Sequence, residues 1–519
     1  MQVRAILFDT RSIQRYIFSD NRLKTNIGAS YIVSHVFENV LLGKIVKAGN
    51  FGLQTVDAES WKSGKEIPEE LQTDCYVAYI GGGNALLLFP DKGEDKRKEI
   101  VGAFTEELLV SCPGLKTGAA LGLLQLNTAE HPHAFQDSMA ALYSELKNNQ
   151  NRISPIVNVM NTGLTLACEV NGETANAFVS DGPLVKNGDS RFFSKEVVAK
   201  AEAADKADKE LLKEFSDVLE GHVFPKELER LGQRESENDI AVVHIDGNNM
   251  GVRFQQCETL TDRSRLSKQV AENTRKAFGE LLKHCVAKYD SYKEFLDLKD
   301  GELPIRPLIL GGDDITFICN ARLALVYTKL FMEFLNDEQC GGLAIDSCAG
   351  IAIVSTSYPF FRAYELAEQL CDVAKKASRK TKGSSWLDFA ILHGEQAPTI
   401  EQIREQEYKG AMGDMHFGPY RVDGDTSYHY HIDKLLQAAD GLEKLPRNKY
   451  KELRMVLQRG RHDMKRYMEQ LRHDELKLPS VTGWEKYEEE LWDNTSGKYQ
   501  TPYVDAIEII DYIPPKEAR

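Results

Sequence analysis

The sequence predicts an α+β fold that contains two ferredoxin-like units, each with the order strand, helix, hairpin, helix, strand. Two observations carry this prediction. Residues 308–318 hold two apolar runs around a Gly-Gly turn, which is typical of a hairpin. A similar pattern occurs near the N-terminus, at residues 76–89. Such internal repetition indicates a duplicated structural unit.

The first predicted unit spans residues 1–165. Short apolar runs bounded by turn residues predict its strands, and apolar residues at helical spacing predict its helices. Its expected elements are a strand at 3–8 that ends before Asp9, a helical pattern at 13–17, the hairpin at 76–89 with its turn at Gly81-Gly82-Gly83-Asn84, a strand at 118–124 and a helix at 134–146.

A connector at residues 166–235 follows the first unit. Its first part is rich in Asn, Gly and Asp, and residues 194–219 form an alanine-rich run with alternating charges. Alternating charges are typical of a solvent-exposed helix. We therefore expect a solvated connector helix rather than a binding element.

The second predicted unit spans residues 236–396 and repeats the plan of the first. The apolar run 240–245 ends at Asp246, and the hairpin turns at Gly311-Gly312-Asp313-Asp314. An apolar strand and an amphipathic helix complete it, at 347–354 and 363–377. When the two hairpins are aligned on their glycines, Gly83 and Asn84 take the places of Asp313 and Asp314.

Residues 397–519 predict a mainly helical C-terminal domain. The stretch 442–478 is basic and amphipathic. A solvated helix face is the first interpretation of such a pattern, and a docking surface for a partner subunit or an acidic polymer is the alternative.

Bulk composition excludes several classes of protein. The formal net charge of −15 argues against a large non-specific nucleic-acid surface, although a local basic groove is compatible with it. The nine cysteines include no CxxC pair, so neither a zinc ribbon nor a disulfide framework is expected. The sequence shows no signal peptide and no apolar run long enough to span a bilayer. We expect a cytoplasmic protein.

The acids of the second unit predict a catalytic metal site. A strand that ends in Asp246 and a hairpin that carries Asp313 and Asp314 would bring three carboxylates together. Carboxylate oxygens bind Mg²⁺ or Mn²⁺, and such ions stabilise the charge that develops in nucleotidyl transfer. The sequence therefore predicts a metal-dependent palm domain in the second unit, beside a first palm that has lost its acid pair.

Nucleotide phosphates are expected beside these acids. Glycines let the backbone approach a phosphate closely, and the N–H groups at a helix N-terminus attract it. Lys375 and Lys376, on the later helix, would neutralise the phosphate tail. The predicted nucleotide-binding residues of the second unit are Gly247, Asn248, Asn249, Gly251, Gly311, Gly312 and Lys375.

These motifs resemble the large, polymerase-like subunit of type III CRISPR effector complexes, which makes cyclic oligoadenylate messengers. The segment from Ser12 to Phe18 is similar to that family's opening segment, and residues 246–251 resemble its Asp-Gly-Asp-x-Met-Gly loop. Residues 81–84 match its inactive first-palm hairpin, and residues 311–314 match its GGDD. The resemblance implies that two ATP molecules bind across the palm pair, one of them near Gly82, Gly83 and Asn84. One 3′-hydroxyl would attack the other molecule's α-phosphate.

Three features depart from the family pattern. The sequence carries no HD nuclease segment ahead of the first palm, and the connector has Cys168 in place of paired zinc-binding cysteines. Asn248 stands where the family often has a second Asp. The resemblance is therefore compatible with a stand-alone relative in antiviral defence as well as with a CRISPR subunit.

Two alternatives to an oligonucleotide synthase stay open. A diguanylate-cyclase-like enzyme would have a hairpin that ends in Glu-Phe, whereas here Asp313-Asp314 is followed by Ile315-Thr316. The other alternative is a non-catalytic scaffold or nucleotide sensor whose C-terminal helices dock a partner. Retention of Asp313 and Asp314 favours an enzyme that uses ATP or another NTP.

Overall fold

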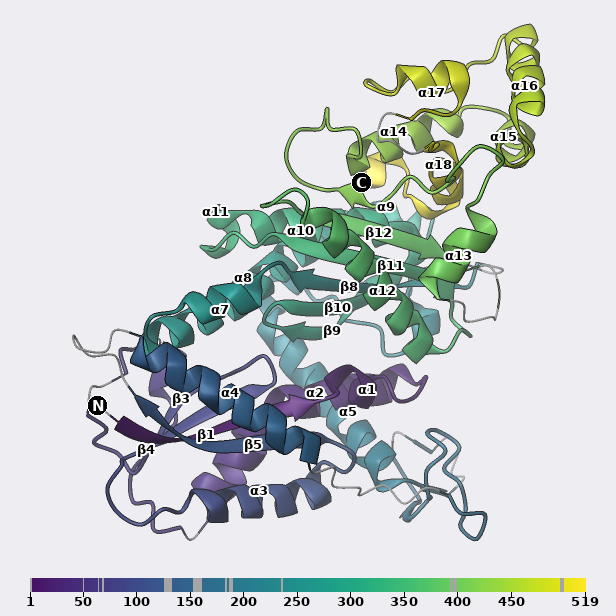
Figure 1. The fold of residues 1–519 in the computed structure, drawn as a ribbon. Helices are drawn as coiled ribbons and strands as arrows, with labels where there is room; N and C mark the ends of the chain where they lie inside the picture. The colour runs from purple at the N-terminus through teal and green to yellow at the C-terminus, as the bar shows by residue number, and fades with distance from the viewer. Residues whose placement is uncertain are drawn as a thin grey trace. The chain divides into compact units, whose positions relative to one another are not determined.

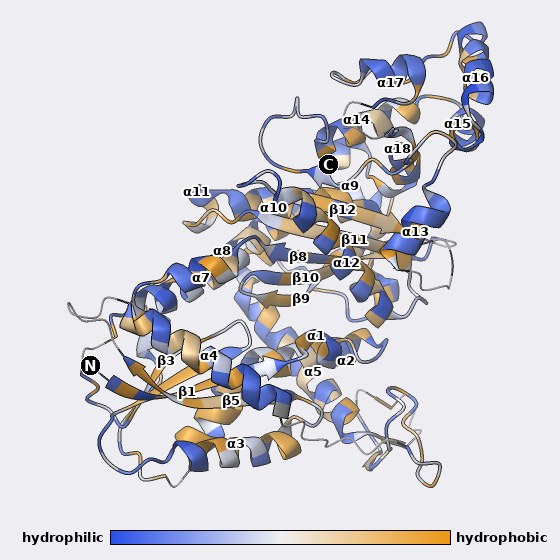
Figure 2. Cartoon of the chain, viewed as in Figure 1, coloured by the Kyte–Doolittle hydropathy of each residue, from blue (hydrophilic) through white to orange (hydrophobic). Residues whose placement is uncertain are grey.

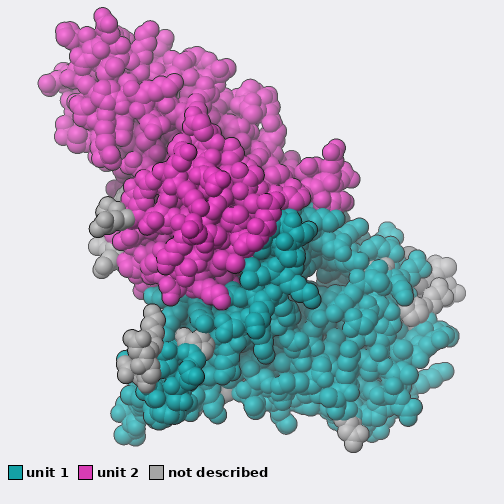
Figure 3. Space-filling view, turned by 180° about the vertical axis from the view of Figure 1, so that it is seen from behind, with its two compact units in different colours: residues 1–219, 249–276, 308–315 teal, residues 220–248, 277–307, 316–519 magenta. Residues whose placement is uncertain are grey.

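The computed structural model of this protein contains two compact units, which Figure 3 distinguishes by colour. Unit 1 comprises Met1–Leu219, Asn249–Lys276 and Leu308–Ile315. Unit 2 comprises the remaining segments, Glu220–Asn248, Ala277–Pro307 and Thr316–Arg519. The structure describes residues 2–49, 51–63, 65–67, 70–125, 133–152, 161–182, 184–185, 190–234, 237–392, 394, 399–494 and 499–519.

The compact units divide the chain more coarsely than the four segments expected from the sequence. The hairpin residues Leu308–Ile315 belong to the same unit as the first ferredoxin-like repeat. The expected boundaries at 235/236 and 396/397 fall outside the described residues. The four-segment division therefore stays a prediction.

The N-terminal repeat contains the elements of a ferredoxin-like unit (Figure 1). Its element η1 is a π-helix that continues the helix before it. The elements are β1 (Gln2–Arg11), α1 (Ile13–Ile17), α2 (Leu23–His35), η1 (Val36–Val46), β2 (Val56–Asp57), η2 (Ser60–Ser63), β3 (Cys75–Gly81), β4 (Asn84–Phe89), α3 (Arg97–Ser111), β5 (Lys116–Gln125) and α4 (Ala134–Arg152).

The first sheet has the strand order β2-β3-β4-β1-β5. β1 pairs antiparallel with both β4 and β5, and Asp9 lies opposite Asn84 and Gly118. Without the short β2, the order β5-β1-β4-β3 is that of a ferredoxin-like βαββαβ unit. The sheet therefore confirms the predicted plan of the first repeat.

α4 covers this sheet through one apolar face. Phe135, Met139, Leu142 and Leu146 are buried in the same cluster as Leu7 of β1 and its neighbours. Their spacing of three and four residues places them on one side of a helix. The amphipathic helix expected at 134–146 is thus confirmed, and it extends to residue 152.

The second repeat has the same order of elements, followed by two further strands. They are β8 (Asp239–Gly247), α7 (Met250–Gln256), α8 (Leu260–Ala287), α9 (Tyr289–Lys293), β9 (Ile305–Gly311), β10 (Asp314–Asn320), η4 (Ala321–Leu323), α10 (Ala324–Asn336), α11 (Glu338–Gly341), β11 (Ser347–Ser355), α12 (Phe360–Ser378), β12 (Trp386–Ile391) and β13 (Tyr420–Arg421).

The second sheet has the strand order β13-β12-β11-β8-β10-β9. Its part β11-β8-β10-β9 repeats the order β5-β1-β4-β3 of the first sheet, so the duplication inferred from the sequence is confirmed in the topology. β12 adds parallel to β11, and β13 pairs antiparallel with the other side of β12. β8 and β11 are buried along nearly their whole length, which explains why both read as continuous apolar runs.

The connector contains a small ribbon and a long helix that packs within unit 1. Lys200 of this helix is completely buried, and a Cβ added at Gly28 of α2 would lie 1.7 Å from the Lys200 carbonyl oxygen. The expectation of a solvated helix was therefore wrong. Alternating charge does not reveal that Lys200 pairs with Glu196 one turn earlier. The connector elements are β6 (Ala177–Val179), β7 (Arg191–Phe193), α5 (Lys195–Glu214), α6 (Ser216–Leu219) and η3 (Leu228–Arg230).

The region after β12 is mainly helical, as expected, although its β13 extends the second sheet. The basic stretch 442–478 contains two helices, which meet at Gly460 with φ +113°. The outer helices of this region are largely hydrophilic in Figure 2, and Arg459, Arg461 and Lys465 are exposed. The helices are α13 (Ile400–Glu407), α14 (Ile432–Leu442), α15 (Arg447–Arg459), α16 (Arg461–His473), α17 (Glu485–Glu490), α18 (Tyr503–Ile509), η5 (Ile510–Tyr512) and η6 (Lys516–Ala518).

All nine cysteines are free thiols. In the described part of the chain, no helix is both long enough and apolar enough to cross a membrane.

Candidate nucleotidyl-transfer site

The two hairpins have turns of the same length at matching places, as the sequence predicts. β3 ends at Gly81 and β4 begins at Asn84, while β9 ends at Gly311 and β10 begins at Asp314. Each hairpin therefore turns over two residues, and the acid pair of the second hairpin replaces Gly83 and Asn84 of the first. Gly312 has a φ of +74°, a conformation that glycine adopts without steric cost.

The acidic hairpin is held by side chains of unit 1. The Thr274 hydroxyl on α8 donates to the Gly312 carbonyl oxygen, and the Ser30 hydroxyl on α2 donates to the Leu308 carbonyl oxygen. Gln14 Nε2 on α1 donates to Asp314 Oδ2 at 3.2 Å. Asp313 and Asp314 are both half-buried. The hairpin tip is thus ordered by neutral donors.

Asp246 lies at the end of β8 and forms an ion pair with Lys375 of α12. The two side chains are 27% and 24% exposed, so solvent reaches both. Burial lowers the pKa of Lys375, but the Asp246 carboxylate raises it, and the net direction is upward. Lys375, predicted to bind phosphate, therefore forms an ion pair with Asp246, a predicted metal ligand.

The loop after Asp246 contains one residue whose side chain serves the fold. Asn248 Nδ2 donates to Ser378 Oγ at 3.1 Å and to the Ser384 carbonyl oxygen at 3.2 Å. Its backbone N–H donates to the Asp346 carbonyl oxygen at 2.7 Å. These bonds engage the side-chain and backbone donors of Asn248 within the fold. The predicted nucleotide role of Asn248 stays a prediction.

The turn that follows β1 and the turn that follows β8 share a backbone feature. Asn249, three residues after Asp246, has a φ of +59° and precedes α7; Ser12, three residues after Asp9, has a φ of +52° and precedes α1. Positive φ at a non-glycine residue is uncommon and is often found at functional sites. The duplication thus extends to the local backbone.

Asp9, the equivalent of Asp246 in the first repeat, accepts a hydrogen bond from a side-chain amide. Gln150 Nε2 donates to Asp9 Oδ2 at 2.6 Å. Burial raises the pKa of Asp9, opposed by this hydrogen bond and by Arg11. Because Asn84 lies opposite Asp9 where an acid would be needed, the first repeat has no carboxylate pair at its hairpin.

The strand order makes β10, which begins at Asp314, the neighbour of β8, which ends beyond Asp246. Among the described residues, no group of three or more His, Cys, Asp and Glu side chains is arranged to hold a metal ion. Mg²⁺ commonly uses only one or two carboxylates and takes its other ligands from substrate phosphates and water. The half-buried carboxylates of Asp246, Asp313 and Asp314 are ligands of this chemical type. That they converge on one ion stays a prediction.

The other predicted binding residues lie at a hairpin tip, in a helix and at the end of a strand, where the sequence had predicted a loop for Gly247. Gly251 is exposed in the first turn of α7, and Gly82 is exposed at the tip of the first hairpin. Gly247 is buried on β8 opposite Ser347. Lys376 is exposed on α12. Sequence reasoning missed the contact of Gln14, because its partner is Asp314, far along the chain.

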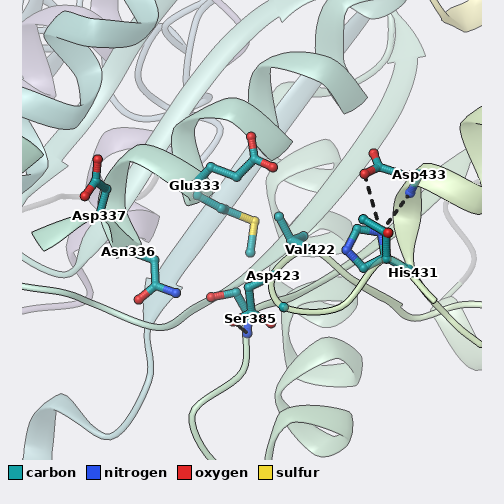
Figure 4. A pocket seen from close by; sticks show the side chains of 11 residues that line it. Glu333, Asn336, Asp337, Ser385, Val422, Asp423, His431 and Asp433 are labelled. Carbon is teal, nitrogen blue, oxygen red and sulfur yellow. Dashed lines mark hydrogen bonds and ion pairs between the residues drawn. The ribbon is translucent and has the colours of Figure 1, made fainter. Parts of the chain in front are cut away.

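A separate acidic cavity lies in unit 2, and none of the predicted site residues lines it. Figure 4 shows Glu333 of α10 above Asp423, with His431 and Asp433 at one side. Its volume is about 300 Å³. It is lined by Met332, Glu333, Asn336, Asp337, Ser385, Val422, Asp423, Gly424, Thr426, His431 and Asp433.

Comparison with known proteins identifies the second repeat. Residues 239–383 match the family described as Cas10/Cmr2, second palm domain. No curated protein matches the chain.

Three solved structures of a Csm1–Csm4 cassette contain a chain with a similar fold. In the complex with cA4 the TM-score is 0.53 and the identity 11%, over 99% of this chain and 70% of the other. In the complex with pppApA the values are 0.51 and 11%, over 98% and 69%. In the complex with cA3 they are 0.50 and 11%, over 98% and 70%. At this identity the likeness concerns the fold.

The duplicated βαββαβ topology, the acidic hairpin of the second repeat and the family match of residues 239–383 agree with one another. Residues 239–383 therefore match the second palm domain of Cas10/Cmr2, and the chain shares its fold with a chain of the Csm1–Csm4 cassette.

Proposed function

We propose that this protein is a metal-dependent nucleotidyltransferase that joins ATP, or another NTP, into a cyclic or linear oligonucleotide. The observation that carries this proposal is the acidic hairpin of a Cas10/Cmr2-type second palm, on the strand next to the one that bears Asp246. Crystal structures of the similar Csm1–Csm4 cassette contain cA4 and pppApA, which favours adenine nucleotides as substrates.

The acids would hold the metal, and other groups of the chain would hold the nucleotide. Asp246, Asp313 and Asp314 would bind Mg²⁺ or Mn²⁺, which would stabilise phosphate charge and activate the attacking hydroxyl. The backbone of Gly247, Gly251 and Gly312 would allow phosphates to approach. The degenerate hairpin with Gly82, Gly83 and Asn84 would contact the second nucleotide.

Lys375 would have two partners in this site. It forms an ion pair with Asp246, which lowers the repulsion among the acids of the site. Its ammonium group would also neutralise triphosphate charge beside a cation that Asp246 would hold.

The setting that we propose is antiviral defence of the CRISPR type III kind. The match to Cas10/Cmr2 and the similarity to the Csm1–Csm4 cassette support this setting. In that setting the exposed basic residues of α15 and α16 would be available to a partner subunit, and the protein would act in the cytoplasm.

Incubation with each NTP and Mg²⁺ or Mn²⁺ tests the activity, with products analysed by chromatography and mass spectrometry. The wild-type protein should release pyrophosphate and form a 3′,5′-linked product. The double variant Asp313→Ala/Asp314→Ala should lose about 10³-fold in rate, because several kcal/mol of charge stabilisation would disappear.

Asp300→Ala is a matched control, because the Asp300 side chain is 99% exposed and pairs with Lys293, away from the predicted site. It should retain wild-type activity. A product formed from GTP alone would favour the diguanylate-cyclase-like alternative. Tight nucleotide binding without any product would favour the sensor and contradict the proposed activity.

A further inference from the structure

We propose that Gln14 of the first repeat is a positioning residue that orients the Asp314 carboxylate for the metal; this inference rests on the proposed function. Gln14 Nε2 donates to Asp314 Oδ2 at 3.2 Å. Both residues belong to compact unit 1, which contains Leu308–Ile315 together with Met1–Leu219. The degenerate repeat would therefore contribute directly to the acid site of the catalytic repeat.

The chemistry of an amide donor suits this role. A carboxylate that must bind a cation needs a fixed orientation and a full negative charge. Lys or Arg would fix the orientation but would compensate the charge, as Lys375 does for Asp246. The neutral amide of Gln14 orients Asp314 and leaves its charge in place. Hydrogen-bond partners of ligating carboxylates typically change metal affinity or activity by 10- to 100-fold when they are removed.

The degenerate hairpin fixes the N-terminal end of α1. The Thr10 backbone N–H donates to the Gly83 carbonyl oxygen at 2.8 Å. A Cβ added at Gly83 would lie 2.7 Å from Ile13 Cδ1, closer than real Cβ contacts. The first hairpin therefore packs against the residue that precedes Gln14, and a methyl group at position 83 would have to shift the end of the Ile13 side chain.

A buried lysine fixes the C-terminal end of α1. Lys200 Nζ donates to the Tyr16 carbonyl oxygen at 2.6 Å and to Ser19 Oγ at 2.8 Å, and its side chain is 0% exposed. Glu196 compensates its charge. Because α1 has only five residues, its two ends determine where Gln14 lies.

A second contact brings the same N-terminal segment to the acidic hairpin. The Ser30 hydroxyl on α2 donates to the Leu308 carbonyl oxygen on β9. The first 30 residues thus hold the hairpin at its strand and at its tip. This arrangement accounts for a first repeat that has lost its acids and kept its hairpin, since that hairpin supports α1.

Metal affinity of the full-length protein tests the proposal without relying on turnover. Titration with Mn²⁺ alone, followed by electron paramagnetic resonance, should show about 10-fold weaker binding for Gln14→Met than for wild type. Met fills nearly the volume of Gln but donates no hydrogen bond. The unfolding temperature of Gln14→Met should stay near that of wild type, and its NTP turnover should recover at high Mn²⁺ concentration.

Gly83→Ala and Gly82→Ala form a matched pair of backbone variants. Both glycines have positive φ, at +75° and +58°, but a Cβ at Gly82 meets nothing within 4 Å. Both variants bear the cost of positive φ, and only Gly83→Ala would also displace Ile13. Mn²⁺ affinity should therefore fall several-fold further in Gly83→Ala than in Gly82→Ala.

Gln458→Ala, on the exposed surface of α15, serves as the control for loss of a glutamine and should bind Mn²⁺ like wild type. Wild-type Mn²⁺ affinity in Gln14→Met, in a protein that binds Mn²⁺ and makes product, would overturn the positioning role and leave the proposed function intact. Failure of the wild-type protein to bind Mn²⁺ would instead overturn the proposed function, and with it this inference.

Discussion

Asn248 occupies a position of the loop motif after Asp246, and its side chain forms hydrogen bonds within the fold. The family that this sequence resembles often has a carboxylate at this position. This chain has an amide there, which donates to Ser378 Oγ and to the Ser384 carbonyl oxygen. The side chain of an aspartate at this position would have no N–H to donate. The residue thus ties the loop after Asp246 to the end of α12 and to the segment that follows it.

Asn248→Asp should destabilise the protein by about 1–3 kcal/mol, because it loses two donors and places a carboxylate against a carbonyl oxygen. For a domain of 150–250 residues, each kcal/mol corresponds to a shift of about 2–4 °C in unfolding temperature. Differential scanning calorimetry measures the shift. Asn249→Asp is the matched control, because Asn249 is exposed and Asp also tolerates the left-handed conformation. Equal unfolding temperatures for the two variants would contradict the bracing role of Asn248.

At the scale of elements, the packing of α12 on β11 places Lys375 beside Asp246. A Cβ added at Gly350 of β11 would lie 1.9 Å from the Ala367 carbonyl oxygen and 2.5 Å from the Cys371 backbone nitrogen. The helix backbone therefore rests directly on the strand at this point. Lys375 follows Cys371 by one helical turn, so the close approach also sets the position of its ammonium group.

Gly350→Ala should lower the free energy of unfolding by about 1–3 kcal/mol or more, because the added methyl group separates α12 from β11. Gly102→Ala is a control with the opposite sign. Gly102 lies within α3 and a Cβ there meets nothing within 4 Å, so alanine should stabilise that helix by about 1 kcal/mol. Urea titration followed by circular dichroism gives both values. A Gly350→Ala variant that unfolds at the wild-type urea concentration would show that α12 can move away from β11 without loss.

At the scale of the whole molecule, a buried charge cluster holds the C-terminal helices of unit 2 to its sheet. His416 Nε2 lies 2.9 Å from Asp388 of β12, and His416 Nδ1 lies 2.9 Å from Asp505 of α18. Arg404 of α13 also pairs with Asp388, at 3.1 Å. Tyr420 donates to Asp505 at 2.5 Å. With a carboxylate at each ring nitrogen, His416 satisfies both of them only as the doubly protonated imidazolium.

This cluster predicts a loss of stability at alkaline pH. Burial and Arg404 lower the pKa of His416, the two carboxylates raise it, and the net direction is above the ordinary value of 6.5. A group with a raised folded-state pKa stabilises fully below its unfolded pKa, and the contribution disappears as pH rises through the folded pKa. The unfolding temperature should therefore fall as the pH rises above about 6.5 and through the raised pKa of His416.

His416→Gln should flatten this part of the pH profile, because glutamine does not titrate. Thermal unfolding across the same pH range provides the comparison. His473→Gln is the control, since the His473 side chain is 90% exposed and should leave the profile unchanged. A pH profile of His416→Gln that parallels wild type would show that another group causes the alkaline loss.

Sequence patterns determined the features that depend on neighbours along the chain. The two-residue turns at Gly82-Gly83 and Gly312-Asp313, the strand that ends at Asp246 and the face of α4 all follow from local periodicity and turn chemistry. The repeat of these patterns was sufficient to predict two βαββαβ units. The acid pair marked one of them as the candidate catalytic palm, as the match of residues 239–383 supports.

Only the tertiary structure decided which distant side chains meet. The bonds Gln14–Asp314, Lys375–Asp246 and Asn248–Ser384 join residues that are 300, 129 and 136 positions apart. The burial of Lys200, against the expectation from its charge-rich helix, depends in the same way on the distant carbonyl of Tyr16. Periodicity reports which face of an element is apolar, and it carries no information about the partner that the face will find. The sequence by itself therefore determined the two βαββαβ units and the positions of Asp246, Asp313 and Asp314 along the chain. Tertiary packing decided which side chains surround these acids.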